Sequence, residues 1–237
     1  QFDYRFAENA DVDNEMFYVN LWQGAATPTA VLHLAPGFVR INIKENGNII
    51  HTMFMMDTHS NVTEDNINGT KEDGGYDHLW ENQFKWYEWA VKGTAAIAGR
   101  PVPSSVFFHI PVVEFKDAWD AAYDKDAKCY KDEYAATSFG VNHESPCPAR
   151  ENNGFFALCK KLGSTKDIIC GHDHVNSASI LYDGIRLTYA LKTGSGCYWE
   201  QEMSGGTKLT VDSNGIMTTE HVYINPTQFG IDLTNLG

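Results

Sequence analysis

The chain has 237 residues, of which 43% are hydrophobic and 21% charged, and its formal net charge is −13. This size suits one large domain or two small ones, and the composition is that of a globular protein. The acidic balance argues against a nucleic-acid partner or an anionic membrane surface, because both need basic patches. No apolar run approaches the roughly 18 residues of a transmembrane helix, so no membrane span is expected.

The sequence leaves the cellular compartment open. The chain starts at Gln1 with neither Met nor a signal-peptide pattern, so we expect a processed or truncated amino terminus. Its five cysteines form no Cys-x-x-Cys pair. Glycosylation sequons at Asn61 and Asn68 matter only in a eukaryotic secretory route. The balance favours a secreted or extracytoplasmic location over a cytoplasmic one.

Apolar periodicity and turn residues predict a mixed series of strands and helices after an unassigned segment, residues 1–37. In chain order, the expected elements are strands at 38–44 and 49–56, a helix at 77–92, a strand at 105–111, helices at 112–123 and 153–162, strands at 167–170, 180–182 and 185–191, and a hairpin of 208–211 with 216–224. Asp77 is expected to cap the first helix and Gly93 to end it. The order predicts an α/β or α+β layered domain over residues 38–237, and we take it as α/β.

Three histidines follow buried strands of this series. His109 ends the strand at 105–111, and His172 and His174 follow 167–170 in the sequence Gly-His-Asp-His, where Gly171 is expected to let the chain turn sharply. Open α/β sheets bind ligands at the carboxyl ends of their strands, and three imidazoles suit Zn, Fe, Mn or Ni. The alternatives are a core histidine at position 109 and plain loop histidines at 172 and 174. Asp57 and His59, at another strand end, could also imitate a ligand pair.

Several motifs surround these histidines in a fixed order. They are Phe54–Asp57 with Ser60, Gln83 with Trp86, Val106–Pro111 with Glu114 and Phe115, Asn142–Asn153, Cys170–Asn176, and Arg186 with Thr193 and Gly194. From about residue 38 to 224, this set resembles the calcineurin-like metallophosphoesterases of the purple-acid-phosphatase-like group. The resemblance implies a β-sandwich flanked by helices.

The resemblance also implies a site and a reaction. Two metal ions (Fe, Zn or Mn) would activate a water that attacks a small phosphate ester. By the matching motifs, His109 and His172 would bind one ion and His174 the other, with Glu144 and Asn176 as substrate-binding or second-shell residues. No catalytic acid or base is identified.

The amino-terminal motifs of that family, which supply aspartates, an Asn ligand and a catalytic His, are not found before residue 109. The sequence Asn142-His143-Glu144 matches part of one of these motifs. It lies after the strand at 105–111, out of the family's order, so we interpret the match as coincidence. We therefore expect the carboxy-terminal portion of a phosphoesterase domain, with an exposed sheet edge and apolar face for a complementary amino-terminal half. The alternatives are a non-catalytic fragment or binding module that keeps the fold, and a mononuclear hydrolase using the three histidines alone.

Overall fold

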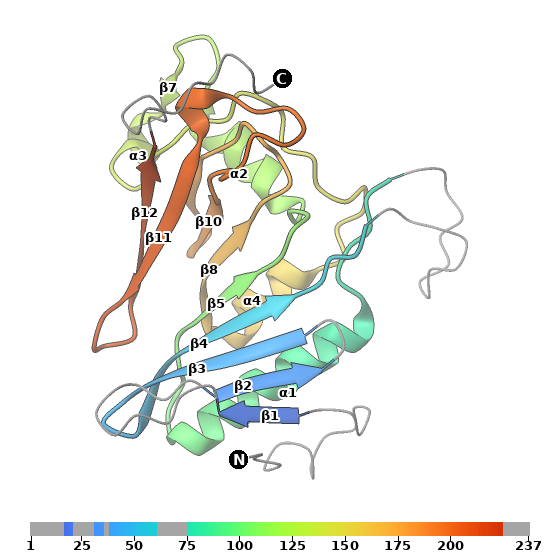
Figure 1. The fold of residues 1–237 in the computed structure, drawn as a ribbon, viewed down its shortest axis with the longest axis vertical. Coiled ribbons are helices and arrows are strands. Elements are labelled where there is room, and N and C mark those ends of the chain that lie inside the picture. The colour runs from blue at the N-terminus through green and yellow to red at the C-terminus, as the bar shows by residue number, and fades with distance from the viewer. Residues whose placement is uncertain (1–16, 21–30, 36–37, 61–74, 225–237) are drawn as a thin grey trace.

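The computed structural model describes residues 17–20, 31–35, 38–60 and 75–224 (Figure 1). Its centre is a sheet of eight strands in the order β1-β2-β3-β4-β5-β8-β10-β9. These strands are β1 Phe17–Asn20, β2 Val31–Ala35, β3 Phe38–Glu45, β4 Asn48–Met56, β5 Ser104–Phe107, β8 Thr165–Cys170, β9 Ser179–Tyr182 and β10 Ile185–Tyr189. Strands β4, β5, β8 and β10 run parallel to one another, and the remaining pairs are antiparallel. The sheet is therefore mixed, with parallel strands at its centre and antiparallel pairs toward both edges.

The remaining elements are helices and two short hairpins. They are α1 Glu81–Ala98, α2 Glu114–Ala122, β6 Tyr123–Asp124, β7 Cys129–Tyr130, α3 Asp132–Ala135, α4 Phe155–Leu162, the 3₁₀ turn Gln201–Met203, β11 Gly205–Val211 and β12 Met217–Tyr223. Figure 1 shows α1 and α4 together on one side of the sheet. Among the described residues, no helix has the length and apolar character to cross a bilayer.

The hydrophobic core lies between the sheet and the helices. Alternate residues of the parallel strands, including Phe54, Val106 and Ile168, are fully buried there. Trp86 and Tyr87 of α1 meet Phe54 edge-on, with ring centroids 5.9 and 5.1 Å apart. Such aromatic contacts add to the burial of large apolar surfaces, so α1 is fixed firmly against the sheet.

The opposite face of the sheet receives the hairpin of β11 and β12. His51 of β4 and Ser105 of β5 point to this side, between the residues that face the helices. His51 contacts the backbone oxygen of Gly215 at the hairpin turn (2.8 Å), and the Ser105 hydroxyl contacts the sulfur of Met217 (3.1 Å). Polar contacts thus dock the hairpin where the other face uses apolar packing.

The first helix differs from its sequence prediction at both ends. It begins at Glu81, not at Asp77, and it continues through Gly93 to Ala98. Asp77 is buried, and its carboxylate accepts hydrogen bonds from the indole of Trp80 (3.1 Å) and the backbone of His78 (2.8 Å), so it holds the entry loop. The helix stops at Gly99, whose φ of 66° is the left-handed conformation of a helix C-cap.

The other predicted elements are confirmed, with boundaries shifted by a few residues. The sequence prediction missed β1 and β2, which lie in the unassigned segment and extend the sheet, and the short β6, β7 and α3. A sheet with helices on one face is compatible with a metallophosphoesterase-like fold. The sandwich, its incompleteness and the domain boundary at residue 38 remain predictions.

Candidate metal site at the carboxyl edge of the sheet

The parallel register of β5 and β8 brings two of the predicted ligands together. His109 and His172 each lie two residues beyond the end of their strand, and the Gly171 amide donates to the His109 carbonyl (3.2 Å). The His109 Nε2 and His172 Nδ1 atoms are 3.4 Å apart, and the rings stand at 87° to one another. His109 is exposed, so the alternative of a core histidine is wrong.

This separation fits two ligands of one metal ion. Two imidazole nitrogens bound at about 2.05 Å in tetrahedral geometry lie roughly 3.3 Å apart. The observed 3.4 Å is close to this value. The chemistry agrees as well, since neutral imidazole is the commonest metal ligand. The pair therefore suits a shared ion without rearrangement of the two loops.

The sharp turn after β8 is made by His172 and not by Gly171. His172 has a φ of 75°, a conformation that costs a non-glycine residue energy and that concentrates at functional sites. Tyr76 packs edge-on against its ring, with centroids 4.2 Å apart. Partial burial lowers the pKa of His172. Its imidazole is therefore held in the neutral form that a metal ligand needs.

Asp173, between the two histidines, points into the protein. Its side chain is buried and accepts hydrogen bonds from the Tyr189 hydroxyl (2.6 Å) and the Cys147 amide (3.1 Å). Burial raises the pKa of Tyr189 well above its usual value, so this hydroxyl stays protonated and donates. Asp173 thus fixes the loop and does not join the histidine pair.

His174 turns toward Tyr198 instead of toward the pair. The two rings stack with centroids 4.3 Å apart, and the Nδ1 of His174 lies 2.9 Å from the Tyr198 carbonyl oxygen. Because a carbonyl only accepts, Nδ1 carries the proton and Nε2 keeps its lone pair. Metal-binding histidines commonly donate their second nitrogen in this way.

Glu144 and Asn176 lie together behind His174. The Asn176 side-chain oxygen accepts from the Glu144 amide (3.1 Å), and the Glu144 carboxylate accepts from the Val175 amide (3.2 Å) and the Tyr198 hydroxyl (2.9 Å). Desolvation, reinforced by Glu144, raises the pKa of Tyr198 to about 12. Glu144 therefore contacts Tyr198, which in turn contacts His174. The sequence prediction missed Tyr198 because its loop has no periodic or motif signal.

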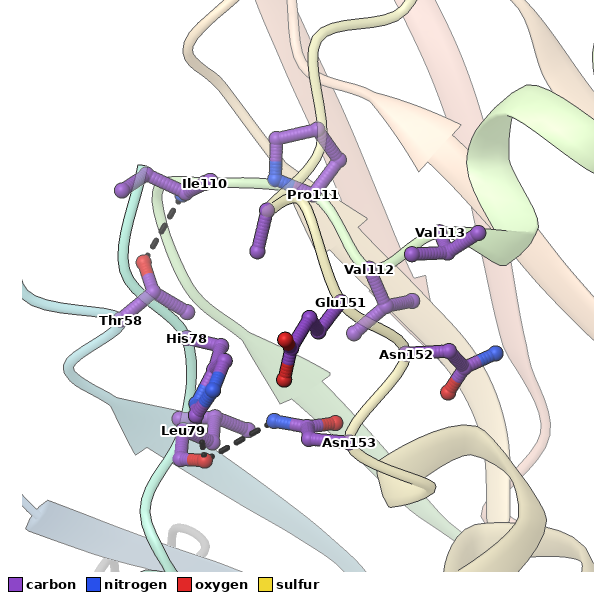
Figure 2. A pocket seen from close by; sticks show the side chains of 11 residues that line it. Thr58, His78, Leu79, Ile110, Pro111, Val112, Val113, Glu151, Asn152 and Asn153 are labelled. Carbon is purple, nitrogen blue, oxygen red and sulfur yellow. Dashed lines mark hydrogen bonds between the residues drawn. The ribbon is translucent and has the colours of Figure 1, made fainter. Parts of the chain in front are cut away.

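The loop that carries His109 is tied to the end of β4. Figure 2 shows the Thr58 hydroxyl accepting a hydrogen bond from the Ile110 amide, at 2.8 Å. Beneath it, between the His78 ring and the Glu151 carboxylate, lies a cavity of about 10 Å³. Such a space holds at most one water molecule, so this cavity does not take a substrate.

The other candidate ligands have partners elsewhere. His59 stacks on Trp80 (3.8 Å) and contacts the Gln83 side chain (3.3 Å), and His143 pairs with Glu200 (2.5 Å). Within the described ranges, no group of three or more His, Cys, Asp or Glu side chains is placed to hold a metal ion. The described residues thus offer one histidine pair and a separate His174.

Comparison with known proteins gives one relationship. The chain is 29% identical over 138 residues to a protein of Arabidopsis thaliana named probable inactive purple acid phosphatase 29. The match covers 54% of this chain and 32% of the plant protein, so it spans about a third of that relative. No family model and no solved structure matches. The similarity suggests a metallophosphoesterase-like relationship and leaves catalysis open.

Proposed function

We propose that this chain supplies part of a metal-dependent phosphoesterase site, in which His109 and His172 bind one metal ion and His174 a neighbouring one. The observation that carries the proposal is the 3.4 Å approach of Nε2 of His109 to Nδ1 of His172. The similarity to a purple-acid-phosphatase-like protein supports a phosphate ester as substrate. When bound, two ions (Fe, Zn or Mn) would lower the pKa of a water between them and neutralise the phosphate.

The chain's own residues prepare this site. Tyr198 orients His174 in two ways. Its ring stacks on the imidazole, and its carbonyl oxygen accepts a hydrogen bond from Nδ1–H, which leaves Nε2 available. Glu144 holds the Tyr198 hydroxyl, and Asn176 holds the Glu144 backbone. These contacts support the role of Glu144 and Asn176 in positioning, behind the ligands, and not in direct binding of the ion.

The remaining ligands would come from a complementary amino-terminal half, in the same protein or in a partner chain. The face of β3, β4 and β5 opposite the helices supports such a partner. It carries a patch of half-buried apolar side chains, Val39, Ile41, Ile43, Met53, Met55 and Phe107. Patches of this kind commonly mark interaction surfaces.

Two other functions stay in competition. A binding module without catalysis is favoured by the lack of a third ligand near the pair, within the described ranges, and by the word inactive in the relative's name. A mononuclear hydrolase would need His174 to leave Tyr198 and join His109 and His172, because zinc hydrolases of that type use three protein ligands.

Calorimetric titration of the metal-free chain with Zn²⁺ and Mn²⁺ tests the proposal, together with an assay on 4-nitrophenyl phosphate. We expect about one weakly bound ion per chain, at the His109–His172 pair, since two imidazoles are fewer than the three or four protein ligands of zinc sites. His109→Ala and His172→Ala should abolish this binding. His143→Ala is the matched control, because His143 is an exposed histidine of the same region that pairs with Glu200.

The outcomes separate the three functions. One ion without turnover fits a partial site, and turnover that appears when an amino-terminal partner is added would establish the phosphoesterase. Turnover by the chain alone, lost in His174→Ala, would favour the mononuclear hydrolase. A folded chain that binds no ion would overturn the proposal.

A further inference from the structure

A second concave region lies beside the candidate metal site. It is a pocket of about 430 Å³ between the end of α2, the turn joining β6 to β7, and the segment 141–145. This volume is within the usual range of small-molecule sites. The histidine pair and its supporting contacts use none of the pocket's aromatic or lysine side chains. These side chains are therefore free to contact a separate ligand.

One wall of the pocket is aromatic and rigid. Trp119 and Tyr123 stack with their centroids 4.1 Å apart and their planes 16° from parallel, and Tyr130 meets Tyr123 edge-on. Trp119 is only 4% exposed, whereas Tyr123 is half-buried and can offer a ring face to a ligand. A fixed aromatic face suits a flat ring, because stacking then costs little conformational entropy.

The open polar groups of the pocket are donors. Lys125 is exposed and bonds to Asp120 at 2.8 Å, while the exposed Lys128 has no ion pair with any described residue. Asn142 uses its side-chain oxygen to accept from the Ala178 amide (3.1 Å), and its Nδ2 is buried without a hydrogen-bond partner among the described residues. Because this nitrogen is buried, the Asn142 amide closes the floor of the pocket, and the lysines are its accessible donors.

The one carboxylate in the wall does not reverse this balance. Both oxygens of Glu144 accept the Tyr198 hydroxyl at 2.9 Å, and one of them also accepts the Val175 amide. Its oxygens are therefore already engaged on the side of His174. What remains for a ligand is the ammonium group of Lys128, beside a Lys125 that is shared with Asp120, and this favours an anionic oxygen group.

We infer that this pocket binds an aromatic compound that carries an anionic oxygen group. The His143 and Glu144 backbone amides donate to Val175 and Asn176, directly after His174, so the pocket adjoins the candidate metal site. If the proposed function holds, the pocket receives the alcohol portion of the phosphate ester. The substrate class is then an aromatic phosphate ester with a second anionic group. This assignment of the substrate rests on the proposed function, whereas the binding of an aromatic anion to the pocket does not.

The test is a titration of metal-free chain with phenyl phosphate, followed by amide chemical shifts in NMR. We expect shifts at residues 141–145 and in the turn around Lys128, and about tenfold weaker binding in Lys128→Glu, which corresponds to about 1.4 kcal/mol. Lys128→Ala should weaken binding less. Lys85→Glu is the matched control, because Lys85 is an equally exposed lysine on α1, paired with Glu81. Phenol lacks the anionic group and cyclohexyl phosphate lacks the flat aromatic ring, so both should bind more weakly than phenyl phosphate.

Failure of this inference is distinct from failure of the proposed function. Shifts confined to residues 109–111 and 171–174, with unchanged affinity in Lys128→Glu, would overturn the pocket and leave the metal site standing. Pocket shifts in a chain that binds no metal would keep the pocket and overturn the metal site. Equal binding of phenyl and cyclohexyl phosphate would overturn the aromatic part of the assignment.

Discussion

Histidines occupy two different regions of this molecule, and the partners of their ring nitrogens distinguish the regions. Under the hairpin, the buried His51 donates from Nδ1 to the Gly215 carbonyl (2.8 Å) and meets the Ser105 hydroxyl at Nε2 (2.6 Å). His221 likewise contacts the Ser177 carbonyl (2.8 Å) and the Thr207 hydroxyl (3.1 Å). Each of these rings has both nitrogens satisfied by the fold.

At the carboxyl edge of the sheet the arrangement is the reverse. His109 and His172 direct nitrogens at one another across 3.4 Å, on a surface open to solvent. A histidine with two protein partners is needed for structure, whereas the two facing nitrogens are partners only of one another, and a metal ion that bound both would replace their hydrogen bond. The two regions therefore differ in what the ring nitrogens contact, and the proposed metal site lies where the nitrogens lack carbonyl and hydroxyl partners among the described residues.

The largest expected effect is on stability. His51→Ala should lower the free energy of unfolding by about 2–4 kcal/mol, because it leaves a cavity and removes the partners of a buried carbonyl and hydroxyl. His109→Ala, at an exposed position, should change it by less than about 0.5 kcal/mol. Urea denaturation of the metal-free variants measures both values. Similar losses in the two variants would contradict the comparison.

Addition of Zn²⁺ should reverse the order of the two regions, with the larger effect at the sheet edge. At a Zn²⁺ concentration of 100 times Kd, the wild-type free energy of unfolding should rise by about 2.7 kcal/mol, since the ion binds only the folded chain. His51→Ala should keep this gain and His172→Ala should lose it. Thermal unfolding with and without Zn²⁺ provides the readout. A gain that survives in His172→Ala would place the ion elsewhere.

Acidification should weaken the hairpin side. Burial lowers the pKa of His51 and His221, so their contribution is complete above about pH 6.5, the unfolded value, and is lost as the pH falls below it. The cost is at most about 1.4 kcal/mol per pH unit for each group. Urea unfolding between pH 7.5 and 5.5 measures this slope, which should be smaller in His221→Gln.

Asp167 acts in the opposite direction and must be separated from the histidines. Burial raises its pKa to about 6, so the folded state holds this proton more tightly than the unfolded state does. Its ionisation therefore costs stability, and the cost is relieved as the pH falls through about 6. In Asp167→Asn the acid destabilisation should be steeper than in wild type, and a shallower slope would contradict this assignment.

The smallest effect concerns backbone strain. His172→Gly should stabilise the metal-free chain by about 0.5 kcal/mol, because glycine adopts a φ of 75° without the steric cost that histidine carries. The same variant should bind no ion at the pair. Chemical denaturation and calorimetric titration of one preparation test both statements, and a loss of stability would show that the ring contributes more than the strain costs.

Much of this fold follows from local patterns. The alternation around Ile41, the apolar run around Ile168 and the glycine after Leu162 each predicted the correct element. Strands β1 and β2 were missed because their apolar runs, FYVN and VLHLA, are only four and five residues long, and their place depends on pairing with β3. Asp77 resembled a helix cap, but its carboxylate accepts a hydrogen bond from the Trp80 indole. This contact depends on the folded conformation of the entry loop.

The site was predictable to the extent that it depends on strand ends. His109 and His172 share a sheet edge because their strands are parallel neighbours, and the sequence indicated only that each histidine follows a buried strand. The orientation of His174 and the role of Tyr198 depend on a loop that returns over the site, and sequence periodicity does not report such contacts. Metal binding by the three histidines remains a prediction.

The register of β5 and β8 also bears on how the chain folds. These strands pair Ser105 with Asp167 and Val106 with Ile168, so each joins residues about sixty positions apart. Closing so long a loop costs entropy before the contacts compensate for it, which makes such pairings slow to form. His109 and His172 meet only after β5 and β8 are joined. We therefore expect metal affinity to develop in step with this late pairing, and a refolding chain to acquire it after its helices have formed.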